Sequence, residues 1–405
     1  MKRSVVFCAV LFGLALCLAV STFSSESQAA GKPDKIVLAA IPDMTGPYAA
    51  IVGPAQAAFQ DAAEYVNETG GIKGVPLEIM VRDCGGKIDV GVNIYMQYRE
   101  MDPKPAMIYG VLSGLGEALK ERMNEDQIPG MWVCSTEVIY PPMYIFGAYP
   151  TYADLCGTFI DWLAATWKES RPPRLAFLTW DTTYGKAVLY DEVRAYAKQK
   201  GVEIVAEELF GVRDVDVSSQ LTRIRAKKPD WIYTNTAGRG PVLVAKAAQE
   251  MGLQAKIAGS IGLDDSCLYI ERGVFEGAVT VHPFANWSET DNKGVQLMNK
   301  YIEKNKRKPE YRTIMYPMGF TGVLVLKEVV ERIVDQQGWD KVDGPNIKAG
   351  MEKLENFNAH DLAIFSYTAK RHSPNMARVF QVQGGKWMPV TDMQQCPDLR
   401  PAQYK

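Results

Sequence analysis

Residues 35–48 read KIVLAAIPDMTGPY, and this stretch decides the fold class. Its first half, residues 35–41, is a short and nearly continuous apolar run, as in a strand that is buried on both faces. The small and polar residues that follow predict a loop, and an amphipathic pattern over residues 55–66 predicts a helix. A buried strand, a loop and a helix in this order begin a unit of parallel sheet.

The same alternation continues along the chain. Residues 70–74 predict a turn, and residues 76–82 alternate as a second strand. Further apolar runs predict strands at 106–111, 130–134, 175–180, 202–207, 231–234 and 278–282, with helical stretches between most of them. Strands separated by helices need right-handed crossovers and form parallel sheets. The sequence therefore predicts an α/β fold.

The first thirty residues predict export. Lys2 and Arg3 precede an apolar run at 5–20, and a polar stretch then ends at Ala29 and Ala30. This is the order of a secretory signal with a small-residue cleavage site, which we expect over residues 1–30. A membrane anchor is the weaker interpretation, because the apolar run falls short of the roughly 20 residues that a spanning helix needs. Removal of the signal leaves a length that suits two lobes.

Charge and cysteine usage narrow the partners. The 45 basic and 47 acidic side chains give a net charge of -2 without any block of like charge, so we expect no nucleic-acid partner. The cysteines outside the predicted signal are Cys84, Cys134, Cys156, Cys267 and Cys396. Their spacing is too wide for a zinc or redox motif, and their odd number implies a free thiol or an intermolecular bridge. Their pairing stays open.

Motifs for catalysis are missing from the sequence. His282, His360 and His372 share no short motif with a cysteine or with one another, which argues against a metal site. Ser113-Gly114 lacks the preceding glycine of a nucleophile elbow. Lys186 is followed by Ala187 and not by the Ser or Thr of a phosphate loop. We expect no enzymatic activity, no metal and no cofactor.

Glycines and small polar residues gather where the predicted strands end. The loops concerned are residues 43–48, 110–116, 133–136 and 181–185. Open parallel sheets bind their ligands at the carboxyl ends of the strands. Residues 110–116 also lead into a predicted helix, whose first free N–H groups attract an anion. These loops are the candidate binding site.

A series of motifs carries a family resemblance. It comprises residues 36–48, residues 67–74 (NETGGIKG), Tyr184-Gly185 after a strand, residues 217–224 with 228–230, and residues 384–387 (GGKW). In order and spacing the chain resembles the type I periplasmic binding proteins related to leucine/isoleucine/valine receptors. The resemblance spans nearly all of the chain after the predicted signal.

The resemblance implies an architecture and a role. The architecture is two Rossmann-like lobes with parallel sheets and three hinge crossovers. Lobe one would combine residues 31–150 and 283–360, and lobe two residues 151–282 and 361–405. The role is that of a monomeric periplasmic receptor, which closes on a small carboxylate-bearing solute and delivers it to the permease of an ABC importer. A ligand-sensing module is the alternative role.

The resemblance also places the ligand contacts. In relatives that bind amino acids, lobe one holds the ligand carboxylate at positions that match Ser113, Ser135 and Thr136, with Gly114 beside them. Hydroxyl and N–H groups at a helix start suit this task because they donate to a carboxylate without a competing counter-charge. A helix cap is the alternative role for Ser135 and Thr136. Tyr48 and Tyr184 would close over the ligand from opposite lobes.

One departure from the family pattern leaves the ligand open. Amino-acid receptors of this family place an acid where this chain has Ile261, and only a shifted loop would let Asp264 or Asp265 replace it. Arg239 would lie near the rim of the cleft. Trp132, Trp180, Trp287 and Tyr316 are further aromatic candidates, or else core residues. A branched-chain or other amino acid is expected, with an aromatic or aliphatic carboxylate that lacks an amino group as the alternative.

Overall fold

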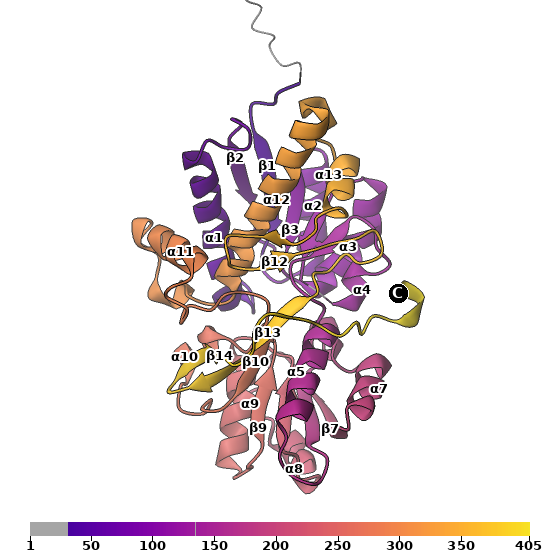
Figure 1. Ribbon diagram of the computed structural model, residues 1–405, viewed down its shortest axis with the longest axis vertical. Coiled ribbons are helices and arrows are strands. Elements are labelled where there is room, and N and C mark those ends of the chain that lie inside the picture. Colours follow the sequence, from indigo (N-terminus) through magenta and orange to yellow (C-terminus); the bar gives the residue numbers. More distant parts are fainter. Residues whose placement is uncertain (1–30, 134) are drawn as a thin grey trace, which may run out of the picture.

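The computed structural model describes residues 31–133 and 135–405. The predicted signal and Cys134 therefore lie outside the described residues. The chain forms two α/β lobes, one above the other in Figure 1, and each lobe is built on its own sheet. We call the lobe with the first sheet lobe one and the other lobe two. In the part of the chain that the structure describes, no helix combines the length and the apolar character needed to cross a membrane.

The sheet of lobe one is entirely parallel, in the order β2-β1-β3-β4-β5. Every residue of β1 is buried, because helices cover both faces of the sheet and the strand pairs on both edges, with Leu38 opposite Met107 in β3 and Ile36 opposite Leu77 in β2. The strands are β1 (Ile36–Ile41), β2 (Leu77–Val81), β3 (Met107–Gly110), β4 (Gly130–Trp132) and β5 (Ile145–Gly147). The apolar run that opens the sequence is thus a central strand.

Helices cover both faces of this sheet. They are α1 (Ala49–Glu68), α2 (Ile88–Arg99), α3 (Ser113–Glu125), α4 (Thr136–Ile139), α11 (Lys293–Lys304), α12 (Met315–Gln337) and α13 (Gly344–Met351). The longest, α12, packs along α1 (Figure 1). Gly319 allows the close approach to α1, and Gly322 allows the close approach to β3. A Cβ on Gly319 would lie 2.5 Å from the Ala55 carbonyl oxygen, and a Cβ on Gly322 would lie 2.4 Å from the ring of Tyr109.

The sheet of lobe two is parallel from β7 to β10, in the order β14-β13-β10-β9-β8-β6-β7. Its strands are β6 (Arg174–Trp180), β7 (Glu203–Phe210), β8 (Trp231–Thr234), β9 (Lys256–Gly259), β10 (Val279–His282), β13 (Met376–Gln383) and β14 (Lys386–Pro389), with β15 (Gln394–Gln395) beside β13. Its helices are α5 (Tyr152–Thr166), α6 (Thr183–Lys186), α7 (Asp191–Gln199), α8 (Ser218–Ala226), α9 (Arg239–Glu250) and α10 (Asp265–Ile270).

One edge of this sheet is antiparallel, whereas the sequence predicted parallel sheets. Strand β13 runs antiparallel to β10, and β14 antiparallel to β13. The β13–β14 turn is Gly384-Gly385, with φ of 60° and 73°. Positive φ at both central residues makes a tight hairpin, which returns the chain without a crossover helix.

The chain passes between the lobes three times: after β5, after β10, and between β12 (Ile364–Phe365), which pairs with β11 (Phe357–Asn358), and β13. This agrees with the predicted three crossovers. The lobe boundaries predicted from the sequence remain a proposal. The four described cysteines outside the signal, Cys84, Cys156, Cys267 and Cys396, are buried free thiols.

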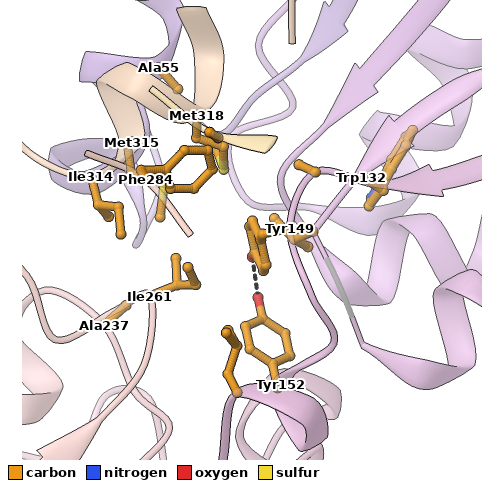
Figure 2. Close-up of a cluster of buried hydrophobic side chains, with 14 of the residues drawn as sticks. Ala55, Trp132, Tyr149, Tyr152, Ala237, Ile261, Phe284, Ile314, Met315 and Met318 are labelled. Atoms are coloured by element: carbon orange, nitrogen blue, oxygen red, sulfur yellow. Dashed lines mark hydrogen bonds between the residues drawn. The ribbon is translucent and has the colours of Figure 1, made fainter. Parts of the chain in front are cut away.

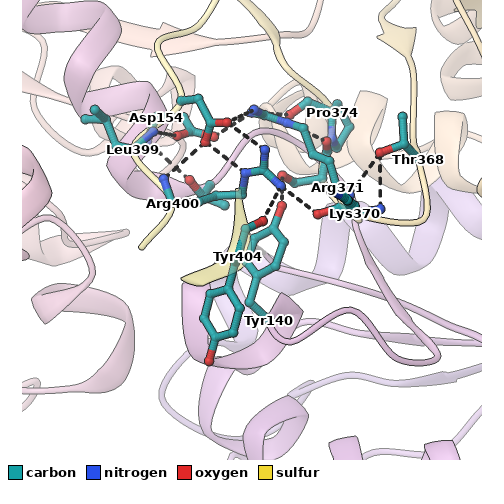
Figure 3. Close-up of polar contacts among 12 residues, drawn as sticks. Tyr140, Asp154, Thr368, Lys370, Arg371, Pro374, Leu399, Arg400 and Tyr404 are labelled. Atoms are coloured by element: carbon teal, nitrogen blue, oxygen red, sulfur yellow. Dashed lines mark hydrogen bonds and ion pairs between the residues drawn. The ribbon is translucent and has the colours of Figure 1, made fainter. Parts of the chain in front are cut away.

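A buried ion pair ties the first and third crossings together (Figure 3). Asp154, in the first turn of α5, is fully buried and accepts from Arg371 Nη2 at 2.7 Å and from the Leu399 N–H at 2.8 Å. The guanidinium of Arg400 lies over the ring of Tyr140, which also stacks on Tyr404 with 5.5 Å between ring centroids. The C-terminal segment is therefore fastened to both lobes at the hinge.

Candidate functional site

A cavity of about 350 Å³ lies between the lobes, where strands of both sheets end. We call it the interlobe cavity. Lobe one lines it from the loops after β1 to β4 and from α12, and lobe two lines it from the loops after β6, β8 and β9. Its apolar walls are Ile51, Val52, Ile88, Val111, Leu112, Val133, Ala237, Ile261 and Met315. Figure 2 shows Met315 and Ile261 facing each other from opposite lobes.

One end of the cavity offers unused backbone donors. Ser113 is the first residue of α3, and the N–H groups of Leu115 and Gly116 donate to the Leu112 carbonyl at 3.1 and 3.0 Å. The N–H groups of Ser113 and Gly114 have no acceptor among the described residues. Both residues line the cavity. The positive end of α3 therefore opens onto the cavity, where it favours an anion.

Ser135 lies behind this end of the cavity, where it contacts the lining residue Ser113. It is buried and does not line the cavity, and its hydroxyl donates to Ser113 Oγ at 2.9 Å. Ser135 precedes α4 but makes no side-chain cap, so its hydroxyl serves Ser113 and not the helix. Thr136, the first residue of α4, is also buried and outside the lining. The structure thus joins Ser113 to Ser135 and leaves Thr136 aside.

The two predicted tyrosines face the cavity from opposite lobes. The loop of Tyr48 is held by the buried carboxylate of Asp43, which accepts from the N–H groups of Gly46 at 2.6 Å and Tyr48 at 2.9 Å. The Tyr48 ring meets Trp180 edge-on at 6.0 Å between centroids. Tyr184 donates its hydroxyl hydrogen to the Thr236 carbonyl at 3.0 Å. It therefore presents its ring and the lone pairs of its oxygen to a ligand.

Both phenols are neutral at neutral pH, and burial moves their pKa values further from it. Burial raises the pKa of Tyr48, with the charge of Asp43 adding to the effect, and it raises the pKa of Tyr184 well above the ordinary value. Neither tyrosine therefore repels an anion in the cavity at neutral pH.

No acid reaches the cavity. Ile261, at the position where the family pattern places an acid, lines the cavity and is 2% exposed. Asp264 lies outside the lining, and its carboxylate accepts from Ser266 N at 3.1 Å and from Ile314 N at 2.9 Å. Asp265 accepts from Asn286 Nδ2 at 3.1 Å. Across residues 31–133 and 135–405 the cavity lining includes no Asp, Glu, Lys, Arg or His side chain.

The four other aromatic candidates also lie outside the lining of this cavity. Trp132 packs against Gly110 and Gly116 and donates its ring N–H to the Leu112 carbonyl at 2.9 Å. Trp287 donates to the Thr313 carbonyl at 3.0 Å, and Tyr316 to Asp61 at 2.5 Å. These three side chains are thus hydrogen-bonded within the protein, and Trp180 contacts the ring of Tyr48.

Two tyrosines in the lining were not predicted. Tyr149 and Tyr152 lie at the first crossing, with their hydroxyl oxygens 2.6 Å apart (Figure 2). The sequence signal was available, because these rings flank the Pro150-Thr151 boundary. A hinge segment necessarily passes beside the cleft, so its aromatic residues are candidates for the lining.

The buried acids near the hinge predict a pH effect. Burial raises the pKa of Asp264 to about 6 and, together with the charge of Asp264, that of Asp265 to about 8. A carboxyl whose pKa is raised by folding stabilises the fold fully below its unfolded pKa of about 4, and this contribution is lost as the pH rises through the folded value. Asp265→Asn should therefore become progressively more stable than the wild type between about pH 4 and 8, and level off above.

The measurement is urea unfolding of both proteins across this pH range. Buried histidines with lowered pKa, such as His282 and His372, act equally in both proteins and cancel in the difference. Asp340→Asn, at an exposed position in the 3-10 helix Trp339–Lys341, is the control and should follow the wild type. A constant difference between Asp265→Asn and the wild type would contradict the prediction.

Comparison with known proteins gives consistent matches. A family profile described as "Periplasmic binding protein" matches residues 35–386. The leucine-, isoleucine-, valine-, threonine-, and alanine-binding protein of Pseudomonas aeruginosa is 23% identical over 301 residues, which are 71% of this chain and 76% of that protein. The Leu/Ile/Val-binding protein homolog 3 of Brucella melitensis is 22% identical over 57% of this chain. That match spans 62% of the Brucella protein, less than two thirds of its length.

Two solved structures share the fold. A branched chain amino acid ABC transporter protein from Thermus thermophilus, with bound valine, has a TM-score of 0.81 at 20% identity over 90% of this chain and 97% of that one. The fatty acid ABC transporter substrate-binding protein from Thermomonospora curvata has a TM-score of 0.79 at 20% identity over 91% and 95%. At such identities the similarity concerns the fold, and it confirms the predicted α/β architecture.

Proposed function

The chain belongs to the periplasmic binding protein family, as its motifs predicted, and from that premise we propose that it is the substrate-binding component of an ABC importer for an apolar carboxylate without an ammonium group. One observation carries the choice of ligand. The cavity offers the donors of Ser113 and Gly114 to an anion, yet its described lining holds no carboxylate for a cation. Burial of an ammonium without a counter-charge would cost several kcal/mol.

The mechanism is closure about the hinge. Hinge closure around a ligand is established behaviour of periplasmic binding proteins as a class. A ligand stabilises the closed form only by contacts that the open form lacks. Here the carboxylate would meet Ser113 of lobe one, and the apolar body would meet Ile261 and Tyr184 of lobe two. The closed receptor then docks on the importer's permease in the periplasm, without catalysing a reaction itself.

A branched-chain amino acid is the second candidate. The name of the Pseudomonas relative and the valine of the Thermus structure favour it. The paired hydroxyls of Tyr149 and Tyr152 add oxygen atoms that could accept hydrogen bonds from an ammonium. Neutral hydroxyls offset the charge of an ammonium less well than a carboxylate does, so this candidate comes second.

The test compares two ligands with one apolar body. Calorimetric titration with 4-methylpentanoate and with leucine measures the effect of the ammonium group on affinity. We expect 4-methylpentanoate to bind more tightly. The Ser113 hydroxyl accepts from Ser135, and its own hydrogen has no acceptor among the described residues, so it can donate to a ligand. Ser113→Ala removes this donor and should weaken 4-methylpentanoate about tenfold or more, because a hydrogen bond to a charged group is worth roughly 1.5–3 kcal/mol. Ser219→Ala, on the exposed face of α8, is the control. Tighter binding of leucine would overturn the choice of ligand, and unchanged affinity in Ser113→Ala would show that the Ser113 hydroxyl does not contact the carboxylate.

A further inference from the structure

A second cavity, of about 630 Å³, adjoins the interlobe cavity. We call it the outer cavity. Ile51 and Ala237 line both cavities, so the two spaces share a wall. The remaining lining is mainly apolar and, apart from Pro47, comes from lobe two, with Trp180, Phe210, Val212, Val242, Leu243 and Ile270. The proposed ligand therefore has an apolar space directly beside its own.

The shared wall is thin. A Cβ placed on Gly238 would lie 3.0 Å from Ile51 Cδ1, so the Ile51 side chain rests on the backbone of Gly238. Gly238 has φ of 58°, a conformation that glycine adopts readily, and it precedes α9. At this point the wall consists of one aliphatic side chain against a glycine. The Ile51 side chain is therefore the part of the wall that would have to move for one ligand to occupy both spaces.

The two charged residues in the described lining of the outer cavity, Asp214 and Arg239, are both exposed. Asp214 accepts from the Gly211 N–H at 2.7 Å, and Arg239 is exposed at the start of α9. In contrast, apolar side chains are left in solvent at its mouth, where Val215 is 88% and Ile270 50% exposed. Apolar surface that converges on a cavity is typical of a binding surface.

We propose that the outer cavity is a tail subsite, which holds the far end of an elongated ligand whose carboxylate lies at Ser113. The chain of this ligand passes Ile51 and packs on Val242 and Leu243. The interlobe cavity alone lies near the lower end of the roughly 300–1,000 Å³ usual for small-molecule sites. The ligand class is then a straight-chain or aryl-substituted alkanoate, longer than a branched-chain amino acid. Only the head group in this inference rests on the proposed function.

The experiment separates the tail from the head group. The dissociation constant is measured for n-alkanoates, n-alkanamides and 2-amino-n-alkanoates of four to ten carbons. The dependence on chain length reports the tail subsite, and the offset between series reports the head group. Affinity should rise roughly threefold to fourfold per methylene, the effect of burying one CH₂, and should continue to rise up to the longest chains.

A variant of the outer cavity tests whether the far end of a long ligand binds there. Leu243→Gln replaces a half-buried wall residue of the outer cavity, and it should weaken decanoate about tenfold or more while leaving butanoate unchanged. Leu209→Gln is the matched control, since Leu209 is 37% exposed and outside the lining of either cavity.

Two results would overturn the tail subsite: affinity that levels off at short chains in every series, or equal decanoate binding by Leu243→Gln and Leu209→Gln. Amides that bind as tightly as carboxylates, with the length dependence intact, would support the tail subsite and overturn the head group of the proposed function. Absence of binding in all series would overturn both.

Discussion

Replacing Arg371 by Met is expected to lower the free energy of unfolding by about 3–5 kcal/mol, the usual cost of removing one partner of a buried ion pair. Asp154 is fully buried, and Arg371 is the cation that faces it, with only 12% of its side chain exposed. Burial already raises the pKa of Asp154, and the charge of Arg371 opposes that rise. Without Arg371 the carboxylate must be protonated or stay buried as an unpaired charge. Urea unfolding at pH 7 measures the loss.

Arg223→Met is the matched control for this experiment. It removes an arginine from an ion pair with Glu208 at 2.8 Å, but Arg223 is 57% exposed. Such surface pairs contribute little to stability because water screens them. Equal losses of unfolding free energy in the two variants would show that the buried pair of Arg371 and Asp154 stabilises the protein no more than an exposed pair does.

Replacing Ile261 by Asp is expected to weaken binding of an apolar carboxylate by more than about a hundredfold. The new carboxylate would share a closed cavity with the ligand's own, and two like charges that close in a low-dielectric space repel by several kcal/mol. The same acid would supply the counter-charge that an ammonium needs. We therefore expect the affinity for leucine to rise relative to the affinity for 4-methylpentanoate in this variant, as measured by calorimetric titration at pH 7.5.

Ile261→Asn separates the charge from the loss of apolar contact. Asn and Asp have the same size, and both remove the aliphatic wall that Ile261 provides in the cavity. The ratio of the two variants' dissociation constants therefore isolates the negative charge. A ratio near one would mean that the ligand's carboxylate does not share the interlobe cavity with residue 261.

Much of the fold could be predicted because its signals are local. A strand such as β1 is recognisable from its own apolar run, and the helix after it from its own periodicity. The hairpin of β13 and β14 shows the limit. Gly384-Gly385 was recognised as part of a motif, but the pairing of β13 with β10 joins segments about a hundred residues apart. Local patterns do not specify such pairings.

The candidate site, too, could be predicted where its signals are local and could not where they depend on long-range packing. Tyr48, Ser113, Gly114 and Tyr184 line the interlobe cavity because a loop after a parallel strand faces the cleft wherever the strand lies. Their roles as ligand contacts remain a prediction. Asp264 was a candidate by proximity to Ile261 along the chain, but its carboxylate is occupied by Ser266 and by Ile314 of lobe one.

By itself the sequence determined which segments are buried strands and which loops end them, because apolar periodicity and turn residues act over a few neighbours. Only the tertiary structure decided what closes the cavity. Met315 faces Ile261 in the interlobe cavity (Figure 2), and Ile51 rests on Gly238, across separations of 54 and 187 residues along the chain. These contacts depend on how the two lobes pack, and side-chain packing is a property of the assembled surfaces that no short stretch of sequence encodes.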